Sequence, residues 1–277
     1  MTRQEALDSI QWSAQEGWNP GMFDLACMHE ADNAGFLIGE IDGQKVAMIS
    51  VLKFGNSFGF LGYYIVAPDQ RGCGYGWKIW QAGMETLKNR NVALDGVPAQ
   101  IENYKKSGFV LSHNNIRYQI KTSPSDCTPP KSNFAIVDLR KIPFPQVCKY
   151  DADFYPAPRD KLFANWIDQP QSHALGFVAN GKLTAMGVIR KAYTGYRIGP
   201  LFADSKELAL SLFKNLISKI PAGNDVFLDV PDANPKAVEL AKELRMSPGF
   251  ETSRMYTQGA PEISIDRTYG ITSLEAG

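Results

Sequence analysis

The sequence is poor in the residues that build metal sites and disulfide frameworks. Its 277 residues include three histidines and only four cysteines, which stand apart at Cys27, Cys73, Cys127 and Cys148. The cysteines do not have the spacing of metal ligands, and they are too sparse for a disulfide scaffold. The histidines, too, lack a pattern of partner residues; they are His29, His113 and His173. We therefore expect no metal and a reducing, cytoplasmic setting.

An excess of charge of one sign is also missing. Lys and Arg number 29 and Asp and Glu number 29, so the formal net charge is zero. A nucleic-acid or membrane-surface binder would need a basic excess, so we expect neither kind of partner. No apolar run is long enough to cross a bilayer, and the first residues do not resemble a signal peptide. Hydrophobic residues make up 44%, which excludes a mostly disordered chain.

The length of the chain admits one large domain or two medium ones, at about 150 residues per domain. Residues 121–133 contain three prolines among small polar residues, a composition typical of a linker. The predicted organisation is a domain over 1–122, a linker over 123–133 and a second domain over 134–277.

The two halves repeat one pattern. Two β-rich runs flank the turn dipeptide Asp42-Gly43, and two similar runs flank Asn180-Gly181. Two further segments recur in the same order: Leu94-Asp95-Gly96-Val97-Pro98 with Leu228-Asp229-Val230-Pro231, and Gly108-Phe109 with Gly249-Phe250. The sequence therefore predicts two copies of one α+β unit.

Each copy is expected to run helix, hairpin, strand, helix, strand, helix, strand. In the first copy we expect helices at 3–17, 21–31, 74–90 and 99–106, and strands at 35–41, 45–54, 58–66, 91–95 and 109–120, the last of which completes the copy. In the second we expect helices at 204–219 and 234–245 and a strand at 225–230. The β-rich segment 263–274 is expected to dock as a strand.

The most informative segment follows the strand at 58–66. There a glycine-rich turn opens a helix and reads Gln70-Arg71-Gly72-Cys73-Gly74-Tyr75-Gly76. Glycines permit positive φ and close approach of a ligand, and the first amides of a helix attract anions. Arg71 adds forked donors suited to phosphate. The segment predicts a pyrophosphate site, although its spacing fits neither the dinucleotide fingerprint nor the nucleotide-triphosphate loop.

This turn resembles the acyl-CoA motif of the GNAT N-acetyltransferase superfamily, and Tyr104-Lys105-Lys106-Ser107-Gly108-Phe109 is similar to its Tyr-x-x-x-Gly-Phe segment. The resemblance implies two tandem GNAT-like domains, each a twisted mixed sheet flanked by helices. It also implies direct transfer of an acetyl group from acetyl-CoA to a primary amine of a small molecule or peptide. A non-catalytic acyl-CoA sensor and a transferase for longer acyl or aminoacyl groups are the alternatives.

The resemblance also assigns the cosubstrate site. It implies that the amides from Gly72 through Gly76, including those of Cys73, Gly74 and Tyr75, hold the pyrophosphate beside Arg71. It places the pantetheine on the main chain of Ile65 and Val66. That edge is available only if the strand separates from its neighbour, because a paired strand has no free amides.

Two residues are candidates for moving protons. Tyr104 stands where the superfamily often has its general acid, and a phenol can donate to the departing thiolate. Asp95, at a strand end, is the best candidate for the general base. Asp229 occupies the equivalent position in the other copy, so a structural role for Asp95 is equally open; the alternatives for the base are Tyr63, Tyr64 and Glu40.

The second copy lacks the residues that would bind acyl-CoA and move protons. Its corresponding turn has no glycines, and Asp204 and Glu207 would repel a pyrophosphate; these two residues predict a helix N-cap and capping box instead. Ala241 stands where a tyrosine would be expected. The second copy is thus expected to act as a structural or substrate-side partner. The acceptor is expected between the halves, with Trp18, Asn19, Arg159 and Arg197 as lining candidates, or alternatively as ordinary packing and surface residues.

Overall fold

The computed structural model describes residues 1, 4–5, 10–130 and 134–277. The first half contains α2 (Ile10–Gln15), α3 (Asp24–Ala31), β1 (Phe36–Ile41), β2 (Gln44–Phe54), β3 (Phe58–Val66), α4 (Tyr75–Thr86), β4 (Asn91–Gly96), α5 (Ile101–Lys106) and β5 (Val110–Lys121). The predicted order of elements is confirmed there. The expected helix at 3–17 is seen over α2, and its residues 3 and 6–9 lie outside the described part of the chain.

The second half repeats the order. It contains β6 (Ile136–Asp138), α6 (Phe144–Asp151), α7 (Asp160–Asp168), β7 (Ser172–Ala179), β8 (Lys182–Lys191), β9 (Tyr196–Ala203), α8 (Lys206–Ile217), β10 (Asp225–Pro231), α9 (Pro235–Glu243), β11 (Ser247–Tyr256) and β12 (Thr268–Gly270). The described linker residues 123–130 form neither helix nor strand.

The repeated hairpins form because their turn dipeptides accept a left-handed backbone. Asp42 and Gly43 have φ of 50° and 77°, and Asn180 and Gly181 have φ of 52° and 73°. Two successive residues of positive φ make the tight turn whose twist matches that of the strands it joins. The turns therefore set the registers of β1 with β2 and of β7 with β8.

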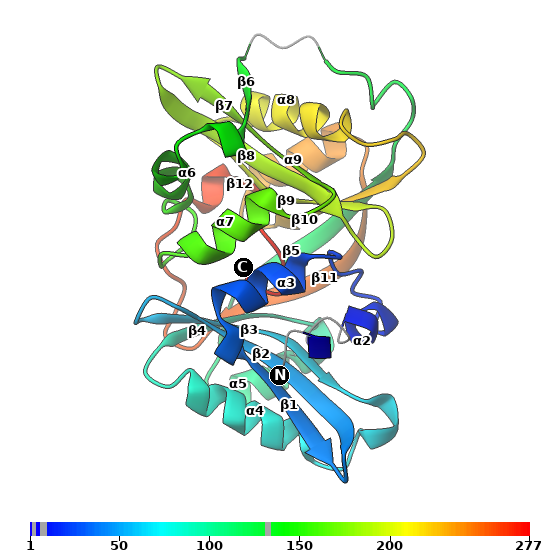
Figure 1. Cartoon of the computed structure of the whole chain (residues 1–277), viewed down its shortest axis with the longest axis vertical. Helices are drawn as coiled ribbons and strands as arrows, with labels where there is room; N and C mark the ends of the chain where they lie inside the picture. The colour runs from blue at the N-terminus through cyan, green and yellow to red at the C-terminus, as the bar shows by residue number, and fades with distance from the viewer. Residues whose placement is uncertain (2–3, 6–9, 131–133) are drawn as a thin grey trace.

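The final strands of the two halves are exchanged. The described strands form one 12-stranded sheet in the order β1-β2-β3-β4-β11-β5-β10-β9-β8-β7-β6, with β12 beside β9. Thus β11 of the second half lies between β4 and β5 of the first, and β5 pairs with β10 (Figure 1). The expectation that the strand at 109–120 completes its own copy is wrong, because both neighbours of β5 come from the other half.

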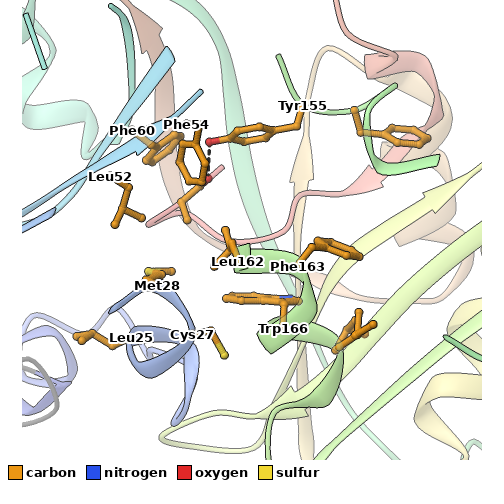
Figure 2. Packing of buried hydrophobic residues seen from close by; sticks show 14 of the residues in the cluster. Leu25, Cys27, Met28, Leu52, Phe54, Phe60, Tyr155, Leu162, Phe163 and Trp166 are labelled. Atoms are coloured by element: carbon orange, nitrogen blue, oxygen red, sulfur yellow. Dashed lines mark hydrogen bonds between the residues drawn. The ribbon is translucent and has the colours of Figure 1, made fainter. Parts of the chain in front are cut away.

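Three apolar clusters stabilise this arrangement. One lies under α4 and α5 in the first half, and another lies under α8 and α9 in the second. The third joins the halves, because helices α3 and α7 pack against each other and against β2 and β3. Figure 2 shows this contact, with Cys27 and Met28 of α3 facing Leu162 and Trp166 of α7. We call this third cluster the inner core.

Two local predictions need correction. The N-cap of α8 is Ser205, whose hydroxyl accepts a hydrogen bond from the amide of Leu208 at 3.3 Å. Asp204 instead accepts hydrogen bonds from Tyr150 and Arg267. Of the segment 263–274, only β12 docks as a strand. Among the described residues, no helix combines the length and the apolar character needed to cross a bilayer.

Candidate active site

A cleft opens in the first half where strands β3 and β4 separate. Their parallel pairing extends only from Phe58 to Leu61 on β3. Beyond Leu61, β3 stays paired with β2 through Val66, and β4 stays paired with β11 through Gly96. The main chain from Gly62 to Val66 is therefore unpaired on its β4 side, which is the free edge that the pantetheine interpretation requires.

A bulge produces this separation. The β2–β3 register shifts between Met48 and Ser50, and Tyr63 on the opposite strand has a φ of 44°. A β-bulge inserts an unpaired residue, bends its strand and increases its twist. A bulky residue such as tyrosine rarely adopts this left-handed region, where it costs of order 1–3 kcal/mol, and Tyr63 does so at the point where the two strands separate.

The cleft has a volume of about 340 Å³ and draws its walls from both halves. The first half contributes Glu16, Trp18, residues 61–66, Arg71, residues 94–97, Gln100 and Tyr104. The second half contributes Phe250, Thr252, Leu274 and Glu275. The predicted residues Ile65, Val66, Arg71, Asp95, Tyr104 and Trp18 are thereby brought to one place.

Tyr104 lies on the outer side of the cleft with an aromatic group beneath it. Its ring stacks on that of Trp80, with centroids 5.5 Å apart, and Trp80 also meets Tyr64 at 5.3 Å. A Cβ on Gly96 would lie 2.2 Å from the Tyr104 ring, so only glycine fits there. Burial raises the pKa of Tyr104 to about 12, which keeps the phenol protonated at neutral pH. Tyr104 can therefore donate a proton into the cleft.

The glycine-rich turn lies beside the cleft. Gly72 and Gly74 both have a φ of 80°, and Gly74 is the N-cap of α4. A Cβ on Gly76 would lie 2.7 Å from the Tyr64 hydroxyl, so the helix start packs closely on β3. The first amides of α4, among them those of Tyr75 and Gly76, have no partner within the helix. Residues 72–76 do not line the cleft itself, so this turn suits a group outside it, such as a pyrophosphate.

Arg71 connects the turn to the cleft wall. Its Nε donates to the carbonyl oxygen of Val66 at 3.1 Å, and its Nη2 pairs with Glu16. The Arg71 side chain is 50% exposed. An exposed ion pair contributes little to stability, so a bound phosphate can compete with Glu16 for the guanidinium.

Asp95 is held in a buried ion pair. Its two oxygens receive hydrogen bonds from Arg254 at 2.8 and 2.6 Å, and Asn115 donates to one of them at 2.8 Å. Burial raises the pKa of Asp95, while Arg254 and Asn115 act in the opposite direction. A carboxylate whose two oxygens both bind a guanidinium is poorly placed to take a proton from a substrate. The geometry favours the structural of the two interpretations.

The equivalent aspartate of the second half, Asp229, makes the corresponding ion pair with an arginine of the first half. Asp229 on β10 pairs with Arg117 on β5 at 2.7 and 3.0 Å, as Asp95 on β4 pairs with Arg254 on β11. Asp229 also accepts from Arg197 at 2.8 Å. Burial acts to raise the pKa of Asp229, but the guanidinium groups of Arg117 and Arg197 outweigh it and lower the pKa. Each ion pair joins an aspartate of one half to an arginine of the other. We call these two contacts the exchange ion pairs.

The corresponding opening in the second half is filled by the chain itself. β9 pairs with β10 only through Ile198, and β12 then lies against β9 beyond that point. A Cβ on Gly270 would lie 2.4 Å from Leu228 of β10 and 3.3 Å from Leu201 of β9. Because β12 occupies the space that β3 and β4 leave open in the first half, the second half has no slot for an acyl-CoA arm.

Among the acceptor candidates, only Trp18 lines the cleft. Asn19 binds Thr194 by three hydrogen bonds of 2.8 to 3.1 Å. Arg159 is buried, pairs with Asp151 at 2.8 and 2.7 Å and stacks on Tyr155. Arg197 is buried behind the cleft and contacts Glu275. These three residues hold the two halves or the second half together, because their polar groups bind protein.

The cleft residues that the motifs did not indicate come from distant segments. Phe250 and Thr252 reach the cleft through the exchanged β11, and Leu274 and Glu275 reach it through the chain end. The motifs carry no signal for these four residues, because the exchange of β11 and the course of the chain end bring them to the cleft, and both are tertiary features. Among the alternatives for the base, Tyr63 and Tyr64 line the cleft, whereas Glu40 is exposed and does not. No group of three potential metal ligands is found among the described residues.

Family models match both halves. The model described as "Acetyltransferase (GNAT) family" matches residues 4–109, and the model described as "Acetyltransferase (GNAT) domain" matches residues 147–270. The two matches divide the chain where the internal repeat divides it, and the second ends with β12.

Individual proteins are similar over almost the whole chain. A holothin acyltransferase from Pseudoalteromonas sp. (strain SANK 73390) is 31% identical over 270 residues, which cover 96% of this chain and 90% of that protein. A crystal structure from Pyrococcus horikoshii has a TM-score of 0.82 at 21% identity and covers 100% of this chain and 94% of that one. A tandem GNAT protein from the clavulanic acid biosynthesis pathway has a TM-score of 0.66 at 14% identity, covering 94% and 96%. The two structures establish the likeness of fold.

Proposed function

Because the chain belongs to the GNAT acyltransferase family, we propose that it transfers an acetyl group from acetyl-CoA to a primary amine of a small molecule, in the cleft of its first half. The observation that carries this proposal is the separation of β3 from β4 beyond Leu61. It leaves a free strand edge that leads from the glycine-rich turn to Tyr104.

The residues of the first half fit the parts of acyl-CoA in order. The amides at the start of α4 and the guanidinium of Arg71 suit the pyrophosphate. The free edge of Ile65 and Val66 suits the pantetheine arm, whose amides hydrogen-bond like an added strand. The second half offers neither, since β12 fills its opening and Ser205 caps the corresponding helix.

Proton transfer in this site requires one donor and one acceptor. The amine nitrogen forms a bond to the thioester carbonyl carbon, the carbon–sulfur bond breaks, and the thiolate takes up a proton. Tyr104 supplies that proton, since its phenol stays neutral and lies on the cleft wall. Asp95 is engaged by Arg254 and serves the fold.

The walls of the cleft support a small acceptor. The cavity has a volume of about 340 Å³ and is lined by the apolar side chains of Trp18, Phe250 and Leu274, so it suits a compact molecule beside the acyl group. A relative that is 31% identical over 270 residues is named a holothin acyltransferase. Holothin is therefore a reasonable first acceptor to assay.

The cosubstrate site is tested by reversing its charge. Arg71→Glu is expected to weaken acetyl-CoA binding at least tenfold in calorimetry, because a carboxylate would face the pyrophosphate. Gly74→Glu should do the same. Arg140→Glu is the matched control, because Arg140 is also about half exposed and pairs with a neighbouring carboxylate, Asp138. Wild-type affinity in both Arg71→Glu and Gly74→Glu would contradict the site assignment.

Catalysis is tested by thiol release. The wild-type protein is incubated with acetyl-CoA and either holothin or a panel of primary amines, and free thiol is measured. An enzyme releases thiol only with an acceptor, whereas a sensor binds the thioester and releases none. Competition among acyl-CoAs of increasing chain length in the same assay separates acetyl transfer from transfer of longer groups.

A further inference from the structure

Three buried polar groups on the cleft walls lack a hydrogen-bond partner among the described residues. They are the Tyr63 hydroxyl, the Thr252 hydroxyl and Oε2 of Glu275. A buried polar atom without a partner loses its bonds to water and gains none in return, and native proteins contain few of them. All three belong to residues that line one cavity, so a polar ligand in that cavity is the candidate for the missing partner.

Glu275 has the chemistry that an amine needs. Its side chain is 5% exposed, and its Oε1 lies 3.4 Å from Nη1 of Arg197. A carboxylate only accepts hydrogen bonds, so its partner must be a donor such as an amine N–H. Arg254 binds both oxygens of Asp95, and Glu16 pairs with Arg71 at a partly exposed position. Among the described cleft walls, Oε2 of Glu275 is thus the buried carboxylate oxygen without a partner.

The position of Glu275 is set by a turn of the last residues. The hydroxyl of Ser273 accepts hydrogen bonds from the amides of Glu275 at 3.1 Å and Ala276 at 3.0 Å. The hydroxyl of Tyr155 donates to the carbonyl oxygen of Ala276 at 2.9 Å. Residues 271–277 are all buried, so this turn holds the carboxylate in one place.

Two glycines, one in β3 and one in β9, leave the space in which this turn packs between the halves. A Cβ on Gly62 of β3 would lie 2.5 Å from the carbonyl oxygen of Glu275, and a Cβ on Gly199 of β9 would lie 2.4 Å from that of Thr272. Any side chain at either position would displace the segment. Gly62 is the first residue of β3 beyond its pairing with β4. Glu275 therefore lies at the point where the two strands separate to form the cleft.

Glu275 and Tyr104 approach the cleft from opposite faces of the sheet. Tyr104 packs on the cluster under α4 and α5, whereas Tyr63 and Ala276 belong to the inner core. In the reaction, the amine nitrogen replaces the sulfur of CoA on the acyl carbon. A proton donor on one face and a proton acceptor on the other suit that exchange.

We propose, on the basis of the transferase function above, that Glu275 binds the acceptor amine and takes its proton. The nitrogen forms its bond to the acyl carbon and gives one proton to Oε2 of Glu275. The carbon–sulfur bond breaks with its electron pair on sulfur, which takes a proton from Tyr104. Loss of a proton from Glu275 to water and uptake of one by Tyr104 restore both groups. The second half thereby completes the active site of the first.

The same walls define the class of acceptor. It is a compact primary amine with an apolar body, which packs on Trp18, Phe250 and Leu274, and with a further polar group for the hydroxyls of Tyr63 and Thr252.

The test compares isosteric variants in the full-length chain, with holothin and a panel of primary amines as acceptors. Glu275→Gln is expected to raise the acceptor KM at least tenfold and to lower kcat/KM about 100-fold. The Kd for CoA in calorimetry should stay within twofold of the wild-type value, and Glu275→Asp should recover part of the lost rate. Thr272→Val is the control, since Thr272 lies in the same buried segment, has an unpaired hydroxyl and does not line the cleft.

Thr252→Val provides a second measurement that keeps Glu275 intact, and it is expected to raise the acceptor KM about threefold to tenfold. Wild-type kinetics in Glu275→Gln, or a loss of CoA affinity that matches its loss of turnover, would overturn the role of Glu275 and leave the transferase function standing. A wild-type protein that binds no acetyl-CoA would overturn the proposed function instead, and this inference with it.

Discussion

At the scale of single residues, the cleft separates polar groups that serve the fold from those left for a ligand. Both Asp95 and Glu275 line it, and their side chains are 0% and 5% exposed. Arg254 binds both oxygens of Asp95, whereas Arg197 reaches only one oxygen of Glu275. Counting the partners of each oxygen therefore distinguishes two carboxylates that the sequence pattern cannot distinguish.

Tyr104→Phe tests the proposed proton donor. The variant keeps the ring that stacks on Trp80 and loses only the hydroxyl, so kcat should fall about 100-fold while the Kd for CoA stays unchanged. Because burial raises the pKa of Tyr104 to about 12, ionisation of this group should cause no loss of wild-type rate below about pH 11. A pH–rate profile and calorimetry measure both effects. Tyr193→Phe, at an exposed tyrosine, is the control, and an unchanged kcat would remove Tyr104 from the mechanism.

At the scale of elements, the space between two equivalent pairs of strands is open in the first half and filled in the second. β3 and β4 separate and leave a slot, whereas the slot between β9 and β10 is filled by β12. β4 keeps its place at the slot because β11 pairs with its other edge. The width of the opening in the first half thus depends on a strand of the second.

The exchange ion pairs should stabilise this arrangement. Asp95→Asn or Arg254→Met leaves a buried charge without its partner, so each should lower the free energy of unfolding by about 3–5 kcal/mol. The double variant should lose less than the sum, since it leaves no isolated charge. Denaturant unfolding of the four proteins measures the cycle. Additive losses would contradict the ion pair, and a loss of turnover without a loss of stability in Asp95→Asn would show that Asp95 acts on the substrate.

At the scale of the whole molecule, the described halves share one sheet and one apolar core. The inner core draws side chains from both, and each exchanged strand hydrogen-bonds mainly to strands of the other half (Figure 1). The retention of a second half with no slot of its own has a physical reason, since that half supplies a wall of the cleft.

Cutting the connection between the halves should therefore leave them together. A protease site inserted after Thr128 and then cleaved should give two fragments that elute as one species in gel filtration. Thermal unfolding should remain a single transition, with a lower midpoint because the unfolded chain gains entropy. Two separate transitions in the intact chain, or fragments that elute apart, would mean that the halves are independent domains.

The sequence by itself determined the elements whose cause is local. Turn dipeptides with positive φ set the hairpins, and glycines before α4 mark the turn that resembles an acyl-CoA motif. These signals depend on neighbours along the chain, so the order of elements, the internal repeat and the position of Tyr104 could be predicted from it. The tertiary structure alone decided that the last strands exchange, that Asp95 faces Arg254, that β12 fills the second slot and that Glu275 reaches the first. Each of these contacts joins segments about 40 residues or more apart. Pairing at that distance depends on how complete faces and edges fit together, which local patterns do not record.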